Sequence, residues 1–65
     1  MDKNVLKGKW KQLQGDAKKQ WGKLTDDDLS KVEGDSVKLA GVLQEKYGYE
    51  KEQAQKEVDQ WLANK

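Results

Sequence analysis

Few side chains in this 65-residue chain have the chemistry that enzymes use. The sequence contains no His and no Cys, which removes the usual general base, the thiol nucleophile and the common zinc ligands. A chain of this length also has little volume in which to bury and tune a Lys or a carboxylate as a base. We therefore expect no enzymatic activity and no cofactor. The hydroxyl groups, none with a histidine to activate it, belong to Thr25, Ser30, Ser36, Tyr47 and Tyr49.

Three consecutive acids, Asp26, Asp27 and Asp28, form the densest group of potential metal ligands. A calcium loop of the EF-hand type needs a glycine turn and a Glu at a fixed distance, and this spacing is absent. Thr25 precedes the acids, and this order is typical of the first turn of a helix, where negative charge is favourable. We therefore interpret the triplet as a helix start with Thr25 as its N-cap, and we predict no bound metal.

The lysines are unevenly distributed along the chain. Residues 1–23 contain seven Lys and two Asp, a net charge of +5, whereas residues 24–65 contain six Lys and ten acids, a net charge of −4. On one continuous helix Lys7, Lys11 and Lys18 share a side, and these three residues are our candidate polyanion-binding site. Nucleic-acid binding stays open as an alternative, although the chain lacks Arg, the residue best suited to bidentate phosphate contacts. The other interpretation is a solvated face that attracts the acidic remainder.

The spacing of the apolar residues predicts an all-α fold of four helices that position these groups. The first helix carries an apolar stripe with steps of four, three, four and four residues, and Gly22 follows it as a left-handed terminating residue. The later helices are expected from Thr25 to Gly34, from Asp35 or Ser36 to Gly48, and over residues 50–63. The stripe of the first helix consists of Leu6, Trp10, Leu13, Ala17 and Trp21.

The tryptophans fit either a core or a membrane surface. Trp10 and Trp21 belong to the stripe of the first helix, and a Lys-flanked stripe with Trp is also typical of helices that lie on membranes. The chain has few other large apolar side chains, so we predict that the tryptophans are buried. The predicted core contains Trp10, Leu13, Trp21, Leu39, Leu43 and Trp61.

The glycines form two sets with the same spacing of seven residues, at 8, 15 and 22 and at 34, 41 and 48. The second set is offset from the first by twenty-six residues. This predicts a pseudo-repeat of residues 8–22 and 34–48, and hence two related helical hairpins. Gly8, Gly15 and Gly41 are expected inside helices, where each costs about 0.5–1 kcal/mol relative to Ala.

Length and composition predict a single domain over residues 1–65, and we expect a monomer. Charged residues make up 38% of the chain, but a net charge of only +1 separates it from disordered chains. No apolar run approaches the roughly 20 residues that a membrane span requires. The N-terminus also lacks the apolar segment of a signal peptide, so we expect a cytoplasmic protein.

Three segments together resemble the CsbD-like family of small bacterial general stress-response proteins. They are residues 7–13 (KGKWKQL), 20–28 (QWGKLTDDD) and 44–49 (QEKYGY). The glycines at 15, 34 and 41 also fit the family pattern. Glu50 departs from it because many relatives carry Thr there, and Asp16 and Val42 replace a basic residue that often follows the preceding glycine.

This resemblance implies two orthogonally packed helical hairpins, as in SAM-like domains, and a role in the bacterial general stress response. It supplies no catalytic residues to carry over. We therefore expect a small cytoplasmic stress-response protein without catalytic activity that acts by binding or protection. The alternatives are a nucleic-acid-associated protein that uses the basic face of the first helix and a peripheral membrane-surface protein.

Overall fold

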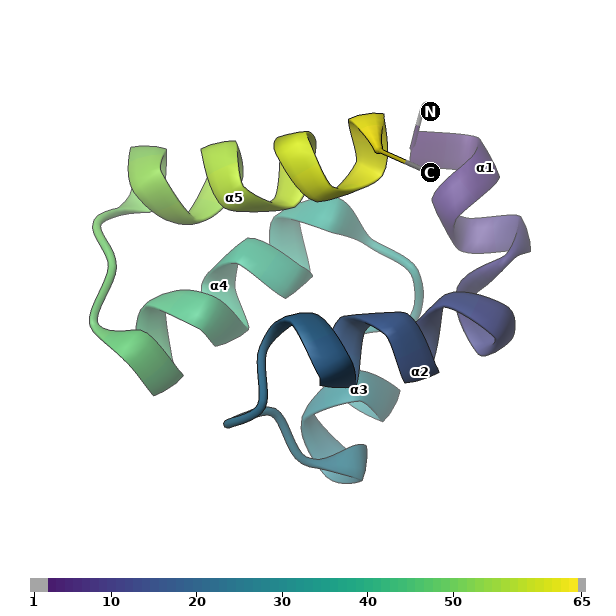
Figure 1. Ribbon diagram of the computed structural model, residues 1–65, viewed down its shortest axis with the longest axis horizontal. Coiled ribbons are helices and arrows are strands. Elements are labelled where there is room, and N and C mark those ends of the chain that lie inside the picture. Colours follow the sequence, from purple (N-terminus) through teal and green to yellow (C-terminus); the bar gives the residue numbers. More distant parts are fainter. Residues whose placement is uncertain (1–2, 65) are drawn as a thin grey trace.

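The computed structural model describes residues 3–64, and over this range the chain forms helices joined by short loops (Figure 1). The predicted all-α class is therefore confirmed. The described residues form five helices instead of the four predicted, because the first predicted helix is broken at Lys9. The helices are α1 Lys3–Gly8, α2 Trp10–Gln20, α3 Asp26–Val32, α4 Ser36–Tyr47 and α5 Lys51–Ala63.

The break between α1 and α2 corrects the prediction of one continuous helix. Lys9 has φ −111° and ψ 14°, outside the helical region, and Gly8 is the last residue of α1. Gly8 therefore ends a helix, although it was expected inside one. Figure 1 shows that α1 turns steeply away from the direction of α2. The turn keeps Leu6 completely buried, so the apolar spacing of a single helix fits the broken helix as well.

The loop between α3 and α4 determines the position of α1, because α1 packs on Gly34 in this loop. A Cβ atom added at Gly34 would lie 2.6 Å from the Cα of Lys7 and 3.3 Å from the carbonyl oxygen of Leu6. Gly34 has φ 77° and follows Glu33, which is also left-handed with φ 53°. Both its backbone conformation and the close approach of α1 therefore require glycine at this position.

The start of α3 confirms the predicted Thr25 cap. Thr25 Oγ1 accepts a hydrogen bond from the Asp28 N–H at 3.1 Å, and Asp28 Oδ2 accepts one from the Thr25 N–H at 3.0 Å. The two bonds form a reciprocal capping box. Asp28 therefore serves the helix start, as its place in the acidic triplet predicts.

The two longer glycine-flanked helices end differently. Gly48 ends α4 with φ 73°, and its N–H donates to the Gln44 carbonyl at 2.9 Å, as predicted. The prediction of a left-handed Gly22 is wrong, because α2 ends at Gln20 and the chain becomes extended at Trp21, with φ −128° and ψ 89°. The extended backbone places the Trp21 ring in the core, so tertiary packing determines this end rather than a glycine turn.

The core confirms all six predicted residues and draws side chains from all five helices. Figure 1 shows α4 and α5 side by side, and α3 packs against α4. The rings of Trp21 and Trp61 meet edge to face at 5.2 Å, and the buried Trp10 Nε1–H donates to the Leu29 carbonyl at 2.9 Å. The face of α5 that enters the core consists of Ala54, Val58, Trp61 and Leu62, as predicted.

Candidate functional site

The three lysines predicted as a polyanion site lie on two helices. Lys11 and Lys18 are both exposed on α2, about two helical turns apart, and so lie on similar sides of it. Lys7 is exposed on α1, beyond the break at Lys9. The structure therefore groups Lys11 with Lys18, and it places Lys7 beside the loop between α3 and α4.

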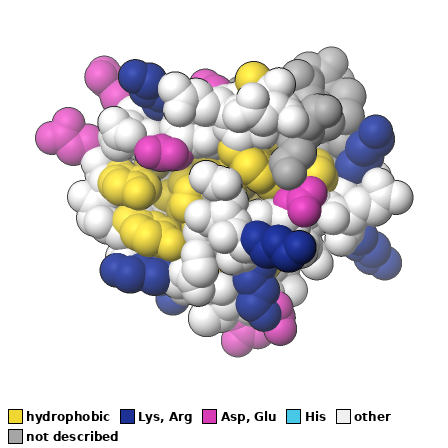
Figure 2. All heavy atoms as spheres, in the orientation of Figure 1, with side chains coloured by type: hydrophobic (Ala, Val, Ile, Leu, Met, Phe, Trp, Pro, Cys, Tyr) yellow, Lys and Arg dark blue, Asp and Glu magenta, His cyan; other side chains and the backbone are white. Residues whose placement is uncertain are grey.

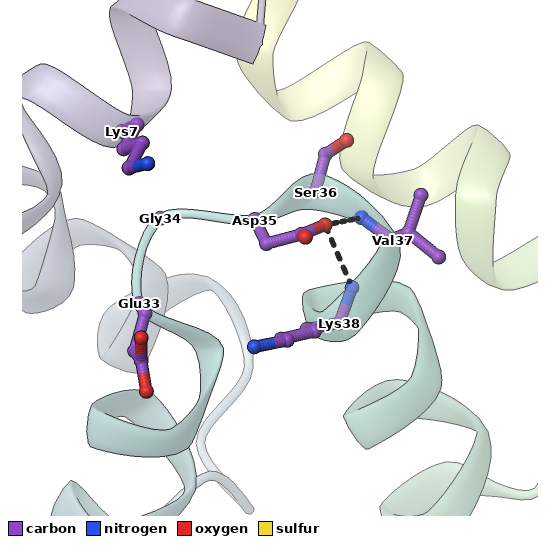
Figure 3. Close-up of a pocket in the computed structure, with 7 residues that line it drawn as sticks. All are labelled: Lys7, Glu33, Gly34, Asp35, Ser36, Val37 and Lys38. Atoms are coloured by element: carbon purple, nitrogen blue, oxygen red, sulfur yellow. Dashed lines mark hydrogen bonds between the residues drawn. The ribbon is translucent and has the colours of Figure 1, made fainter.

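Lys7 lines a cavity of about 310 Å³ at this loop (Figure 3). Two lysines and two acids contribute to the lining, so its formal charges balance. The Asp35 carboxylate is already engaged at the start of α4, where it accepts hydrogen bonds from the N–H groups of Val37 and Lys38 at 2.8 and 3.2 Å. The cavity therefore has no excess of positive charge. The lining residues are Lys7, Glu33, Gly34, Asp35, Ser36, Val37 and Lys38.

The lining also contributes one buried hydroxyl, that of Ser36 in the first turn of α4. Ser36 is 2% exposed, and its oxygen has no hydrogen-bond partner among the residues that the structure describes. Figure 3 shows that it points away from the Lys38 side of the loop. Since the oxygen is enclosed by protein atoms, a solute in the cavity does not reach it as a nucleophile. Among residues 3–64, no group of three or more acidic side chains is arranged to hold a metal ion.

Lys18 forms an ion pair with the first acid of the triplet. Its Nζ lies 3.1 Å from Oδ1 of Asp26, and the side chains are 53% and 86% exposed. Exposed pairs of this kind contribute about 0–1 kcal/mol, and salt weakens them further. A polyanion can therefore displace Asp26 from Lys18 at little cost.

More lysines than the three predicted are accessible on this part of the molecule. Between residues 7 and 23 six lysines are exposed, and Asp16 is the one acid in that stretch. Figure 2 shows lysine side chains over α2. The net charge of residues 1–23 already indicates this surface, whereas one side of a single helix includes only Lys7, Lys11 and Lys18. We name the six the lysine surface: Lys7, Lys9, Lys11, Lys18, Lys19 and Lys23.

At Lys23 the lysine surface meets a pair of aromatic rings from the QEKYGY segment, for which the sequence predicted no binding role. Tyr47 Oη accepts a hydrogen bond from the Lys23 N–H at 3.2 Å, and the Lys23 ammonium lies 5.1 Å from the centre of the Tyr47 ring. The rings of Tyr47 and Tyr49 are stacked, with centres 5.4 Å apart and planes 8° apart. Both rings are partly buried. We name these two residues the tyrosine stack.

Lys46, next to Tyr47, forms an ion pair with Asp28. Its Nζ lies 3.1 Å from Oδ2 of that carboxylate. The hydrogen bond from the Thr25 N–H and, after it, the Lys46 ammonium lower the pKa of Asp28. Lys46 therefore belongs to the α3 helix start rather than to a binding surface.

All three tryptophans are buried, at no more than 7% exposure. A membrane-surface helix would present such side chains outward, and α2 turns its apolar stripe to the core. In the described part of the chain, none of the helices has the length and hydropathy to cross a bilayer.

Comparison with known proteins identifies a family and several similar proteins. A family model described as CsbD-like matches residues 4–56. A UPF0337 protein of Pectobacterium atrosepticum is 59% identical over 61 residues, which cover 94% of this chain and 88% of that protein. The UPF0337 protein YjbJ of Escherichia coli O6:H1 is 56% identical with the same coverage. A UPF0337 protein of Bordetella pertussis is 54% identical over 62 residues, 95% of this chain and 94% of the relative.

Proposed function

Because the chain belongs to the CsbD-like family of small bacterial stress-response proteins, we propose that it is a cytoplasmic, non-catalytic protein that acts by binding. The proposal includes the arrangement that the resemblance implies, with two orthogonally packed helical hairpins over the pseudo-repeat of residues 8–22 and 34–48. Support comes from where the side chains lie. Most of the large apolar side chains, including all three tryptophans, lie in the core, and charged side chains are exposed on the surface.

The ligand class that the surface fits best is a polyanion, and the observation that carries this proposal is the lysine surface. Residues 7–23 contain six exposed lysines and a single acid, although the net charge of the whole chain is only +1. Clustered cations attract polyanions and release the counterions of a phosphate backbone on contact. Of the predicted residues, Lys11 and Lys18 on α2 are central to this proposal, and Lys7 extends the lysine surface onto α1.

The chemistry of lysine also sets the character of the binding. An ammonium group acts as a point charge, whereas Arg contacts phosphate and guanine with two aligned hydrogen bonds. A surface made only of lysines therefore binds the phosphate backbone without reading base sequence. We expect weak affinity that falls steeply with salt, by about 0.9 in log K per log salt for each phosphate contact.

Fluorescence anisotropy with labelled duplex DNA, between about 50 and 200 mM salt, tests the proposal. Replacing the three predicted lysines by Gln should weaken binding and flatten its salt dependence, because phosphate contacts are lost. The matched control removes three exposed lysines from α3 and α5 and should change binding much less. Its substitutions are Lys31→Gln, Lys51→Gln and Lys56→Gln.

Two results would count against this function. Equal loss of binding in both triple variants would show that net charge, and not the lysine surface, controls affinity. Absence of DNA binding at the lowest salt, together with binding to vesicles of anionic lipid, would favour the membrane-surface alternative.

A further inference from the structure

The tyrosine stack is placed where a ligand can reach it, and the core closes without it. Tyr47 and Tyr49 are only partly buried and pack on the outside of the buried cluster. Figure 2 shows hydrophobic side chains at the surface on the left of the molecule, over the end of α4 and the start of α5. Aromatic faces this exposed are few here, because all three tryptophans are enclosed.

The stack is also held in a fixed orientation. Gly48, with φ 73°, ends α4 and returns the chain so that the rings on either side of it lie parallel. Tyr47 is further fixed through its hydroxyl by the Lys23 N–H and over its ring by the Lys23 ammonium. A flat ligand therefore meets a surface whose orientation is already set, so binding loses little side-chain entropy.

We propose that Tyr49, supported from behind by Tyr47, stacks on an unpaired base of a single-stranded nucleic acid whose phosphates continue onto the lysine surface through Lys23. This inference deepens the proposed polyanion function and rests on it. Every base has an aromatic face, so stacking on tyrosine holds a strand without requiring a particular sequence. Lys23 is the link, because it belongs to the lysine surface and contacts the tyrosine stack directly.

The surrounding charges give the strand a direction. Glu50 and Glu52 follow the stack at the start of α5, and with Lys51 between them they leave this segment with a net negative charge that repels phosphates. Lys46 is neutralised by Asp28 and offers them little. Lys23 is exposed and is not in an ion pair with any residue of the described chain. The phosphate backbone is therefore expected to leave the stack toward Lys23 and α2.

The size and shape of the patch favour a base over a protein partner. A stable protein interface covers roughly 800 Å² on each side, and two partly buried rings expose far less than this. A duplex is also a poor ligand for the stack, because its bases are already paired and stacked and do not present their faces. Single strands should therefore bind more tightly than duplexes of equal length.

The experiment compares a labelled thymidine oligomer of about 12 nucleotides with a duplex of equal length, by fluorescence anisotropy at low salt. Tyr49→Leu keeps apolar bulk in the turn but removes the aromatic face. It should weaken single-strand binding about five-fold or more and leave duplex binding unchanged. Tyr49→Phe is the matched control, because it retains the ring, and it should bind the single strand as the original chain does. Glu50→Gln should strengthen single-strand binding, since it removes a charge that repels phosphate.

The outcomes separate the two proposals. If neither nucleic acid binds, the polyanion function fails and the inference fails with it. If both bind equally and Tyr49→Leu changes neither affinity, the polyanion function stands and the tyrosine inference is overturned. If Tyr49→Leu also lowers the urea midpoint, equal weakening of duplex and single-strand binding would assign Tyr49 a structural role and overturn the inference. Selective loss of single-strand binding would support it.

Discussion

The two copies of the glycine pattern, residues 8–22 and 34–48, have helices that begin at equivalent positions but are stabilised by different interactions. Helix α2 begins at Trp10 and α4 at Ser36, twenty-six residues apart, each two residues after a glycine. Lys9 makes no side-chain cap on α2, whereas Asp35 accepts two backbone hydrogen bonds at the start of α4. At the other end both helices have an equivalent local bond, because the Trp21 N–H donates to the Ala17 carbonyl and the Gly48 N–H to the Gln44 carbonyl, each at 2.9 Å. The copies therefore differ at the start of the helix, where the first has no side-chain cap. The first copy is also held by distant residues, through the Trp10 bond to Leu29 and the contact of Trp21 with Trp61.

The two copies should differ most in how much stability they lose when their first glycine, Gly8 or Gly34, is replaced by Ala. Gly34→Ala should destabilise the domain by about 2–5 kcal/mol. About 1–2 kcal/mol comes from the left-handed backbone and about 1–3 from the clash with α1. Gly8→Ala should cause no loss of stability, because a Cβ there meets no atom of the described residues within 4 Å and its φ is not positive. Urea denaturation measures both variants.

Gly48→Ala is the control that isolates the contact with α1. Gly48 shares the positive φ of Gly34, but within the described part of the chain a Cβ there meets nothing within 4 Å. It should therefore lose only about 1–2 kcal/mol. Equal losses at the two positions would mean that α1 yields to the methyl group, and that Gly34 is needed only for its backbone conformation.

The second prediction concerns the glycines of both copies that can be replaced by Ala without a steric clash. Gly15 and Gly41, seven residues into each copy, lie within α2 and α4 in open space, like Gly8. The triple Ala variant should gain up to roughly 1.5–3 kcal/mol from helix propensity and lower unfolded-state entropy. This corresponds to a melting temperature higher by about 4–8 °C per kcal/mol. A lower melting temperature in calorimetry would show that at least one of these glycines has a packing role.

The third prediction tests the local caps. Asp35→Ala should cost about 0.5–2 kcal/mol, and Thr25→Ala a similar amount, because each side chain accepts a hydrogen bond from the first turn of its helix. Lys9→Ala occupies the equivalent position in the first copy and should change stability by less than about 0.5 kcal/mol, since it removes no cap bond. If the Lys9 variant lost as much as the Asp35 variant, the proposed contrast between the copies would be wrong.

The smallest effect is expected from acid. The pKa of Asp28 is lowered in the folded chain by the Thr25 N–H bond and Lys46, so its contribution to stability is fully present above its unfolded value of 3.8. That contribution is lost as the pH falls below this value and through the lowered pKa. Urea midpoints measured from neutral pH to below pH 3 should fall less steeply for Asp28→Asn than for the original chain. Asp27→Asn, which lies outside the capping box, should keep the original slope.

Patterns that depend on near neighbours in sequence were predicted well. The capping box needs only residues three apart, and the buried face of α5 needs only helical spacing. The broken helix at Lys9 and the extended Trp21 could not be predicted this way, because the contacts that cause them involve Gly34 and Trp61, far away in the chain. In the same way, the charge count identified the basic region of the candidate site. It could not reveal that Lys23 meets a residue twenty-four positions later.

The close approach of α1 to Gly34 also has a consequence for the timing of motions in this domain. At six residues, α1 is shorter than the roughly 12 residues that an isolated helix needs to be even marginally stable in water. It is therefore helical only while it rests on Gly34, and its amide protons should exchange with solvent in local openings that leave α4 and α5 intact. Each opening is expected to withdraw Leu6 from the core and to release Lys7 from the cavity wall, while the packed pair of α4 and α5 stays folded.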